Sequence, residues 1–345
     1  MTTILTAGDH FVLNSLLTDR LRPAAPTATF RELTLPWPVE PFGDVGEVRE
    51  ASGTEDQLIE ALGGVDICVT QMAPLTERIL EACPDLRLFC VSRGGPVNAN
   101  LAAATRHGVA VSFAPGRNAT ATAEHTVALM TAAARRVPAT HADLSAGTWR
   151  GDYYMFDKVG PELEGSTVGI VGYGAIGSRV ARILQGFGAH VLVADPFVRH
   201  PDDVSPAEVT DLADLMRRST FVTVHARATP ETEGLISRQM IDLMPAGGVL
   251  VNCARGSLVD YDAVCDALDT GKLFGAAFDV FPREPIPAHS RLLTTPNIVM
   301  TPHLAGASKQ TAFNAASIVA SEVERFLAGR PLAHCANPEV LAPLH

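Results

Sequence analysis

The stretch Val168–Leu184, VGIVGYGAIGSRVARIL, decides the fold that we expect for this chain. It places the pattern G-x-G-x-x-G at Gly172, Gly174 and Gly177, between a continuous apolar run and an amphipathic run. In a strand–turn–helix unit these glycines permit a tight turn, a close approach of backbone to a pyrophosphate, and close packing of helix on strand. The free N–H groups at the helix N-terminus then face the anion. The stretch predicts a dinucleotide-binding fold, with Ala175 and Ile176 inside the cofactor turn.

An acid, Asp195, ends the next apolar run, close to the ~20 residues expected after the glycines. Its carboxylate would accept hydrogen bonds from the adenosine ribose hydroxyls and repel a 2′-phosphate, so we expect NAD rather than NADP. Arg199 is close enough in sequence to attract a phosphate, but a solvated loop residue is the simpler interpretation. The glycines alone would also suit a tight turn in a sheet that binds no nucleotide.

Apolar runs alternate with helical patterns on both sides of this stretch. We expect strands at 167–172, 190–195, 221–226, 248–254, 275–280 and 297–303, and a further strand–helix–strand unit over 65–92. Continuous apolar strands that alternate with helices predict parallel sheets covered on both faces. One long helix is expected from about 119 to 146 and a terminal helix that ends at Gly329. The first sixty residues are proline-rich, and their elements are hard to place.

The length of 345 residues exceeds one typical domain, so we expect two. The fold class is α/β with two Rossmann-like domains. A flavodoxin-like substrate-binding domain is expected over 1–117, completed by 306–345, and a doubly wound NAD-binding domain over 118–305 is inserted into it. Nicotinamide and substrate are expected in the cleft between these domains, where closure would exclude water.

The composition, 47% hydrophobic and 19% charged, is that of a globular protein. The formal net charge of -11 argues against a nucleic-acid or anionic-membrane partner. The start of the chain lacks the basic and apolar regions of a signal peptide, and no window approaches the ~18 apolar residues of a membrane span. The six cysteines form no C-x-x-C pair, which indicates buried free thiols rather than a disulfide framework. We therefore expect a soluble cytoplasmic protein.

Three later segments resemble the D-isomer-specific 2-hydroxyacid dehydrogenase family: VNCARGSLVD (251–260), GAAFDVFPREPIP (275–287) and TPHLAG (301–306). With the glycine turn and ATPETEGLI (228–236), they cover most of residues 90 to 330. The resemblance implies an NAD-dependent oxidoreductase that interconverts a small D-2-hydroxy acid and its 2-oxo acid. It also implies a catalytic set of Arg255, Glu284 and His303.

The chemistry explains why these three residue types are needed. Arg255 offers a planar cationic fork to the substrate carboxylate and carbonyl. His303 can donate a proton on reduction and remove it on oxidation, and Glu284, if bonded to it, would favour the imidazolium and fix its orientation. Each has an ordinary alternative as a surface arginine, a loop acid or a structural histidine. Their joint occurrence after strands of one parallel sheet favours catalysis.

The resemblance implies further cofactor contacts. It places Asp279 near the nicotinamide carboxamide. Along the rest of the cofactor it places His225, Thr232, Cys253, Ala254, Arg255, His303 and Ala305. The family usually has proline where this chain has Arg227, which is then either a rim charge or a handle on an anionic substrate.

The turn SRGGPVNAN (92–100) resembles the family's carboxylate-binding turn, so Arg93, Gly94 and Gly95 are candidate substrate residues. Phosphoglycerate-type members often have an arginine–serine pair where this chain has Gln71 and its neighbours, although Arg93 could substitute for that cation. Because the chain stops soon after its terminal helix, we expect no regulatory domain. We expect a non-phosphorylated 2-hydroxy acid, polyhydroxylated acids included.

Trp149 lies in SAGTWRGDYYMFDKVGPELEG (145–165), which resembles an arm that covers the dimer partner in the family. The alternative is a tryptophan packed within its own domain. We expect a twofold homodimer, the commonest assembly.

Two other functions compete with the dehydrogenase. One is an NAD(H)-binding sensor or corepressor-like interaction protein with the same fold, although the chain has no long charged tail for recruiting partners. The other is a metal-dependent mechanism, but His303 and the nearby acids show no ligand spacing, and we expect no metal.

Overall fold

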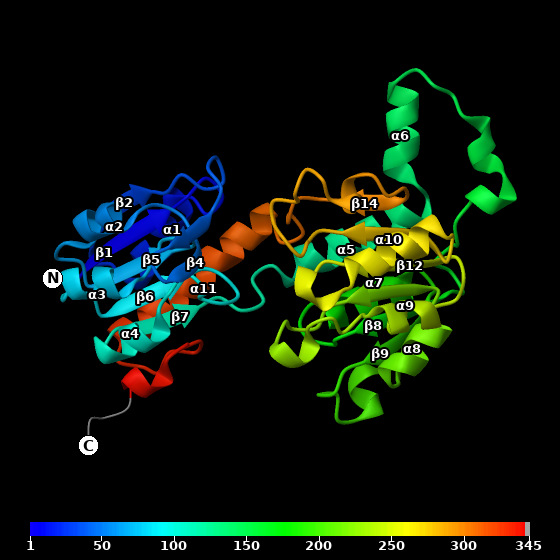
Figure 1. The fold of residues 1–345 in the computed structure, drawn as a ribbon. Coiled ribbons are helices and arrows are strands. Elements are labelled where there is room, and N and C mark those ends of the chain that lie inside the picture. Colours follow the sequence, from blue (N-terminus) through cyan, green and yellow to red (C-terminus); the bar gives the residue numbers. More distant parts are fainter. Residues whose placement is uncertain (342–345) are drawn as a thin grey trace. The chain divides into compact units, whose positions relative to one another are not determined.

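Six apolar runs form strands close to their expected positions in a computed structural model that describes residues 1–341 (Figure 1). They are β8 (Thr167–Val171), β9 (His190–Ala194), β11 (Phe221–Val224), β12 (Gly248–Asn252), β13 (Leu273–Phe278) and β14 (Ile298–Met300). The sequence does not predict a seventh strand, β10 (Glu208–Val209), because two residues are too few to show a periodic pattern.

These strands form one parallel sheet in the order β10-β9-β8-β11-β12-β13-β14. The chain proceeds from β8 through β9 to β10 and then returns to the other side of β8 with β11. The strand order therefore reverses at β8. Sheets of this kind bind ligands beyond the carboxyl ends of the strands at such a reversal.

Helices cover both faces of this sheet. On one face lie α5 (Ala119–Ala134) and α7 (Gly177–Gly186), and on the other α8 (Leu212–Arg218), α9 (Arg238–Leu243) and α10 (Tyr261–Asp269). Neighbouring β8 residues Ile170 and Val171 belong to the two separate cores on these faces. Because both faces are buried, the strands are continuously apolar rather than alternating.

A second parallel sheet is formed by β1 (Thr3–Gly8), β2 (Thr29–Thr34), β5 (Ile67–Thr70), β6 (Leu88–Val91) and β7 (Ala110–Phe113). Its order, β2-β1-β5-β6-β7, is the flavodoxin-like order. One face packs on α1 (Asn14–Ala24) and α11 (Lys309–Leu327), and the other on α2 (Glu55–Leu62), α3 (Glu77–Ala82) and α4 (Leu101–Arg106). The expected α/β fold class is thereby confirmed.

The proline-rich start of the chain holds β1, α1, β2, α2 and an antiparallel hairpin of β3 (Gly43–Val45) and β4 (Val48–Ala51). Short 3-10 helices complete the chain: η1 (Gly151–Tyr154), η2 (Phe156–Lys158), η3 (Pro201–Val204), η4 (Pro230–Thr232), η5 (Gly256–Leu258), η6 (Arg291–Leu293) and η7 (Pro338–Leu341).

The chain divides into two compact units. The first comprises Met1–Asn118 and the C-terminal segment that starts at Ser308, and the second comprises Ala119–Ala307. The sequence places these boundaries at 117 and 305. Each unit contains one of the two sheets together with the helices on its faces.

The expectation of one helix from 119 to 146 is wrong. α5 ends at Ala134, and α6 (Val137–Ser145) starts after Arg136, whose φ of 50° is left-handed. Pro138 occupies the first turn of α6, where a missing N–H costs nothing. Inside a continuous helix the same proline would lose a hydrogen bond and clash with the preceding turn, so the helix breaks there.

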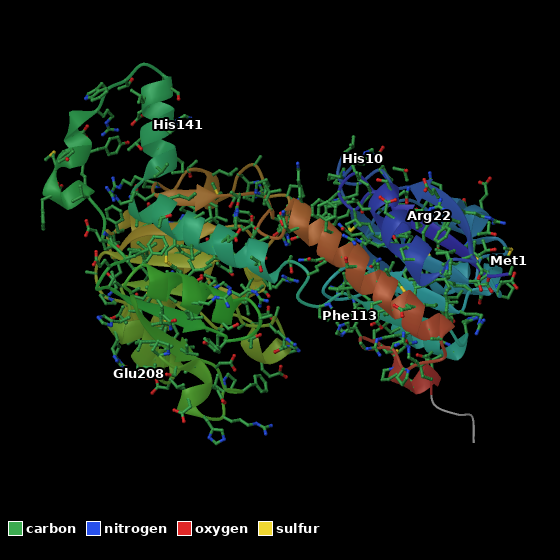
Figure 2. The ribbon with its side chains drawn as sticks, turned by 180° about the vertical axis from the view of Figure 1, so that it is seen from behind. Met1, His10, Arg22, Phe113, His141 and Glu208 are labelled. Atoms are coloured by element: carbon green, nitrogen blue, oxygen red, sulfur yellow. The ribbon has the colours of Figure 1, made fainter. Side chains whose placement is uncertain are left out.

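The segment after α6 carries large apolar side chains in solvent. Trp149 is 86% exposed, and Tyr154 and Phe156 are each 95% exposed. Figures 1 and 2 show α6, which carries His141, and this segment standing away from the sheet of their own unit. The alternative in which Trp149 packs within its own domain is therefore wrong.

All six cysteines are free thiols, and only Cys335 is not fully buried. Within residues 1–341, no helix combines the length and the apolar character needed to cross a bilayer.

Candidate active site

His303 lies in a turn just beyond β14. The strand was expected to extend to 303, but it ends at Met300 because the backbone then turns back toward the end of β13. The N–H of His303 donates to the Asp279 carbonyl oxygen at 2.9 Å, and its φ of 56° is left-handed. Such a backbone is uncommon outside glycine and occurs where the surroundings enforce it, often at functional sites.

Glu284 pairs with His303. Its Oε2 lies 2.7 Å from Nδ1 of His303, and its Oε1 accepts the N–H of Phe281 at 2.9 Å. The hydrogen bond to Glu284 and that carboxylate's charge raise the pKa of His303 above its usual 6.5, against the opposing effect of burial. Burial acts to raise the pKa of Glu284, but the hydrogen bond and charge of His303, the Phe281 N–H and the charge of Arg255 together outweigh it, and the pKa is lowered. The pair therefore favours an imidazolium beside a carboxylate.

Arg255 follows β12 in a turn that Asn252 holds from within the core. Asn252 donates to the Arg255 carbonyl oxygen at 2.8 Å and accepts the Ala254 N–H at 3.0 Å. The exposed Arg255 side chain donates only to the Ala254 carbonyl oxygen among residues 1–341, so most of its N–H groups are available. Its charge lowers the pKa of both His303 and Glu284, which places it electrostatically beside the pair.

Asp279 controls the turn that carries His303. This buried carboxylate accepts the Thr301 hydroxyl at 2.6 Å and the N–H groups of Leu304 and Ala305, each at 2.7 Å. His125 of α5 lies 3.0 Å from the Thr301 hydroxyl and 3.7 Å from Asp279. The sequence places Asp279 only near the nicotinamide and does not identify Thr301 or His125. A histidine in the otherwise alanine-rich α5 is the one signal that points to a polar partner.

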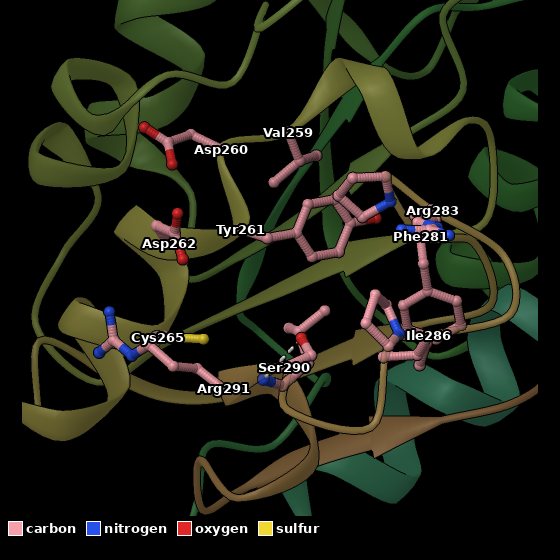
Figure 3. A pocket seen from close by; sticks show the side chains of 13 residues that line it. Val259, Asp260, Tyr261, Asp262, Cys265, Phe281, Arg283, Ile286, Ser290 and Arg291 are labelled. Atoms are coloured by element: carbon pink, nitrogen blue, oxygen red, sulfur yellow. Dashed lines mark hydrogen bonds between the residues drawn. The ribbon is translucent and has the colours of Figure 1, made fainter.

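Tyr261 joins the Arg255 turn to the Glu284 loop. Its hydroxyl donates to the Val280 carbonyl oxygen at 2.6 Å and accepts from Asn252 at 3.2 Å. Tyr261 also lines a cavity of about 370 Å³ with Phe281 (Figure 3). Arg255, Glu284 and His303 are not among the residues that line this cavity, so it lies beside the Glu284 loop rather than at the three predicted catalytic side chains.

The glycine turn has the geometry that the fingerprint requires. Gly172 has a φ of 95°, and a Cβ there would meet the Ala226 nitrogen at 2.6 Å. A Cβ on Gly177 would meet the Gly172 carbonyl oxygen at 2.1 Å, whereas Gly174 faces open space. The turn is therefore closed on the protein side and open where a pyrophosphate would approach.

Asp195 is tied to this turn. Its Oδ2 accepts the Tyr173 N–H at 2.6 Å, and its Oδ1 accepts the Phe197 N–H at 2.7 Å. Each oxygen keeps a second lone pair for a ribose hydroxyl. Arg199 is exposed and has no side-chain partner within residues 1–341.

The other predicted cofactor residues differ in what their side chains do. Burial lowers the pKa of His225 to about 3, so the ring is neutral, and its buried Nδ1 has no partner within residues 1–341. The Thr232 hydroxyl donates to the Arg227 carbonyl oxygen at 2.6 Å and so holds its own loop. Burial raises the pKa of Cys253 to about 12, so this thiol is unreactive. Arg227 is exposed, as expected for a rim charge.

The predicted substrate turn lies in the first unit, after β6. Gly94 and Gly95 face open space, but the guanidinium of Arg93 forms an ion pair with Glu50 and donates to its carbonyl oxygen at 3.1 Å. Arg93 is therefore a neutralised cation rather than a free anion receptor. No group of three metal-ligating side chains occurs in the part of the chain that the structure describes.

Residues 127–305 match the family model described as D-isomer specific 2-hydroxyacid dehydrogenase, NAD binding domain. The D-3-phosphoglycerate dehydrogenase of Methanocaldococcus jannaschii is 36% identical over 83% of this chain and 54% of its own length. The putative 2-hydroxyacid dehydrogenase YoaD of Bacillus subtilis is 37% identical over 74% of this chain and 75% of its own. The chain thus spans about half the length of the phosphoglycerate dehydrogenases that it matches.

Solved structures agree with these matches. The TT0316 protein of Thermus thermophilus superposes with a TM-score of 0.79 at 28% identity, over 97% of this chain and 100% of that one. An NAD-dependent formate dehydrogenase of Staphylococcus aureus in complex with NAD gives 0.76 at 25% identity, over 97% and 98%. The expectation that the cofactor is NAD is confirmed by the NAD-binding family model and by this NAD complex.

Proposed function

Because this chain belongs to the D-isomer-specific 2-hydroxyacid dehydrogenase family, we propose that it interconverts a D-2-hydroxy acid and its 2-oxo acid by hydride transfer with NAD. The observation that carries the proposal is the 2.7 Å hydrogen bond between His303 and Glu284, beside the available guanidinium of Arg255. A proton donor whose pKa is raised and a cation for a carboxylate are what 2-oxo acid reduction requires.

NAD would be held by the turn at Gly172, Gly174 and Gly177 and by Asp195, and when bound it supplies the hydride acceptor or donor. The turn has open space at Gly174 for the pyrophosphate, and no side chain caps the start of α7. Asp195 keeps lone pairs for the ribose hydroxyls. These features fit the cofactor that the family model names.

Proton transfer would occur at Nε2 of His303, because Nδ1 is engaged by Glu284. On reduction, Nε2 donates its proton to the oxygen of the former carbonyl, and on oxidation it removes the hydroxyl proton. Glu284 keeps the ring oriented and stabilises the imidazolium in both directions. Arg255 would bind the substrate carboxylate and polarise the carbonyl oxygen.

Turnover of 2-oxo acids tests this proposal. NADH oxidation is followed with glyoxylate, hydroxypyruvate, pyruvate, phenylpyruvate and 2-oxoglutarate, using the wild type, His303→Ala and the control His289→Ala. His289 is exposed on the loop that carries Glu284. We expect His303→Ala to lower kcat on the order of 10²-fold or more and His289→Ala to leave it unchanged.

Two results would contradict the proposal. Near-wild-type turnover by His303→Ala would remove the assigned proton donor. Tight NADH binding without turnover of any acid would favour the sensor or corepressor-like function instead.

A further inference from the structure

Helix α5 directs one histidine toward the ends of two strands. The helix packs on the sheet of its own unit with apolar side chains such as Ala123 and Met130. His125 differs from them, because its Nε2 lies 3.0 Å from the hydroxyl of Thr301, which is 176 residues further along the chain. The His125 side chain is 26% exposed, so most of the ring is buried where helix meets sheet. Only the tertiary structure brings this pair together.

The direction of the bond between His125 and Thr301 follows from the partners of the hydroxyl. The hydroxyl has one proton, and it lies 2.6 Å from Oδ1 of Asp279. Oδ1 and Oδ2 of this carboxylate also accept the N–H groups of Leu304 and Ala305, so both oxygens act as acceptors, as in an ionised carboxylate. A separation of 2.6 Å is typical of a hydroxyl that donates to a carboxylate. His125 therefore donates to Thr301, and its proton is on Nε2.

His125 acts on Asp279 through Thr301. Its Nε2 lies 3.7 Å from Oδ1 of Asp279, which is longer than a hydrogen bond. The Asp279 side chain is only 1% exposed, and no lysine or arginine forms an ion pair with it within residues 1–341. A hydroxyl that accepts one hydrogen bond becomes a better donor in another, because the bonds of a chain polarise one another. The bond from His125 thus strengthens the bond that holds this carboxylate.

The same two residues hold the backbone of His303. The N–H of His303 contacts the carbonyl oxygens of Asp279 at 2.9 Å and of Thr301 at 3.0 Å. The next two N–H groups in the turn, those of Leu304 and Ala305, donate to the Asp279 carboxylate. These contacts all lie at the ends of β13 and β14. His125 connects them to α5, which lies on the face of the sheet.

We propose that His125 is a positioning residue, which donates to Thr301, aligns the Asp279 carboxylate and so keeps His303 in the orientation needed for proton transfer. The inference rests on the proposed dehydrogenase function, because only a reaction at His303 gives the order of this turn a catalytic consequence. It requires a hydrogen-bond donor at the position of Nε2, and neither an aromatic ring nor a charge can replace that donor.

Two substitutions at His125 separate the donor from the ring. His125→Phe keeps a planar ring and removes the donor, whereas His125→Gln keeps a side-chain N–H. In NADH oxidation with a 2-oxo acid, His125→Phe should lower kcat about tenfold and leave KM for the acid within about twofold. His125→Gln should regain most of the lost kcat. The matched control is His190→Phe at the exposed first residue of β9, which should keep the wild-type kcat.

A double-mutant cycle tests whether His125 acts through Thr301. Once Thr301→Val has removed the hydroxyl, adding His125→Phe should lower kcat by no more than about twofold, because residues that act through one contact are not additive. Losses that multiply in the double variant would overturn the inference. So would a loss of kcat in His125→Gln as large as that in His125→Phe. Both results leave the proposed function intact.

Amide hydrogen exchange measures the order of the turn without substrate. The N–H groups of Leu304 and Ala305 should exchange about tenfold faster in His125→Phe than in the wild type, and at nearly the wild-type rate in His125→Gln. Amides of β8 should not change, which separates a local effect from a loss of global stability. Folding is checked by circular dichroism, and His125→Leu replaces His125→Phe if that variant does not fold.

The two measurements distinguish failure of the inference from failure of the proposed function. Unchanged exchange in His125→Phe, or faster exchange with an unchanged kcat, would overturn the positioning role alone. Turnover of no 2-oxo acid by the wild type would overturn the proposed function and, with it, the catalytic consequence of the turn.

Discussion

At the scale of single residues, the proposed chemistry depends on one hydrogen bond. Nδ1 of His303 and Oε2 of Glu284 lie 2.7 Å apart, and both side chains are partly exposed to solvent. The raised pKa of His303 comes from this contact rather than from burial, which acts in the opposite direction. A change at Glu284 should therefore be seen as a change in the protonation of His303.

The pH dependence follows with a definite sign. Reduction needs the imidazolium, so kcat/KM for reduction should be highest below the raised pKa of His303 and fall as pH rises through it. Oxidation needs the neutral ring and should fall as pH decreases through the same pKa. Glu284→Gln removes the charge and weakens the bond, which lowers the pKa of His303. The pH dependence of both reduction and oxidation should therefore shift to lower pH.

This prediction is tested by pH–rate profiles and by NMR titration of the His303 ring. His289→Ala serves as the control that leaves the profile in place. If the pH–rate profiles of Glu284→Gln stay at the wild-type pH, Glu284 does not set the pKa of His303.

Cofactor choice also depends on a single residue. Asp195 would repel the 2′-phosphate of NADP while accepting bonds from the ribose hydroxyls of NAD. We expect the wild type to have a kcat/KM ratio for NADPH over NADH below one and Asp195→Ala to raise this ratio at least tenfold. Arg199→Ala, at the neighbouring exposed arginine, is the control and should change the ratio little. A wild-type ratio above one would contradict the assignment.

At the scale of elements, the turn after β14 depends on the end of β13. The Asp279 carboxylate holds Thr301 and the N–H groups of Leu304 and Ala305, and its carbonyl oxygen holds the N–H of His303. These bonds compensate for the left-handed backbone of His303. The orientation of His303, the proposed proton donor, is therefore a property of two neighbouring strand ends and not of the histidine alone.

Thr301→Val tests this arrangement. The variant deprives the buried Asp279 carboxylate of the 2.6 Å bond from the hydroxyl, which should lower the free energy of unfolding by about 1–3 kcal/mol and lower kcat. Thr301→Ser keeps the hydroxyl and should restore most of both. Urea unfolding and steady-state kinetics measure the two effects. A loss in the serine variant with none in the valine variant would mean that the methyl group, not the hydroxyl, is important.

At the scale of the whole molecule, the exposed segment after α6 needs a partner surface. Trp149, Tyr154 and Phe156 place large apolar area in solvent, which marks an interaction site in a folded protein. We propose that the partner is a second copy of this chain in a twofold dimer. Light scattering should give twice the mass of 36.5 kDa. Replacing the three aromatic residues by serine should shift the mass toward the monomer, and a monomeric wild type would refute the proposal.

Local sequence patterns determined most of the fold. Six strands of the second unit and the glycine turn could be predicted because continuous apolar runs, turn glycines and a following helix are signals within a few residues. The proline-rich start could not be assigned, because β1, α1 and β2 lack such regular spacing there. β10 could not be predicted because it is only two residues long.

The sequence by itself thus determined six strands of the second unit's sheet, part of the first unit's sheet, the cofactor turn and the three residues proposed for catalysis. Only the tertiary structure decided the rest: the exposure of Trp149, the neutralised charge of Arg93 and the buried Oδ2 of Asp9 that has no partner within residues 1–341. The physical reason is that strand and turn formation depends on neighbours in sequence. Exposure, charge balance and pKa depend on neighbours in space, and Arg93 and its partner Glu50 lie 43 residues apart in the chain.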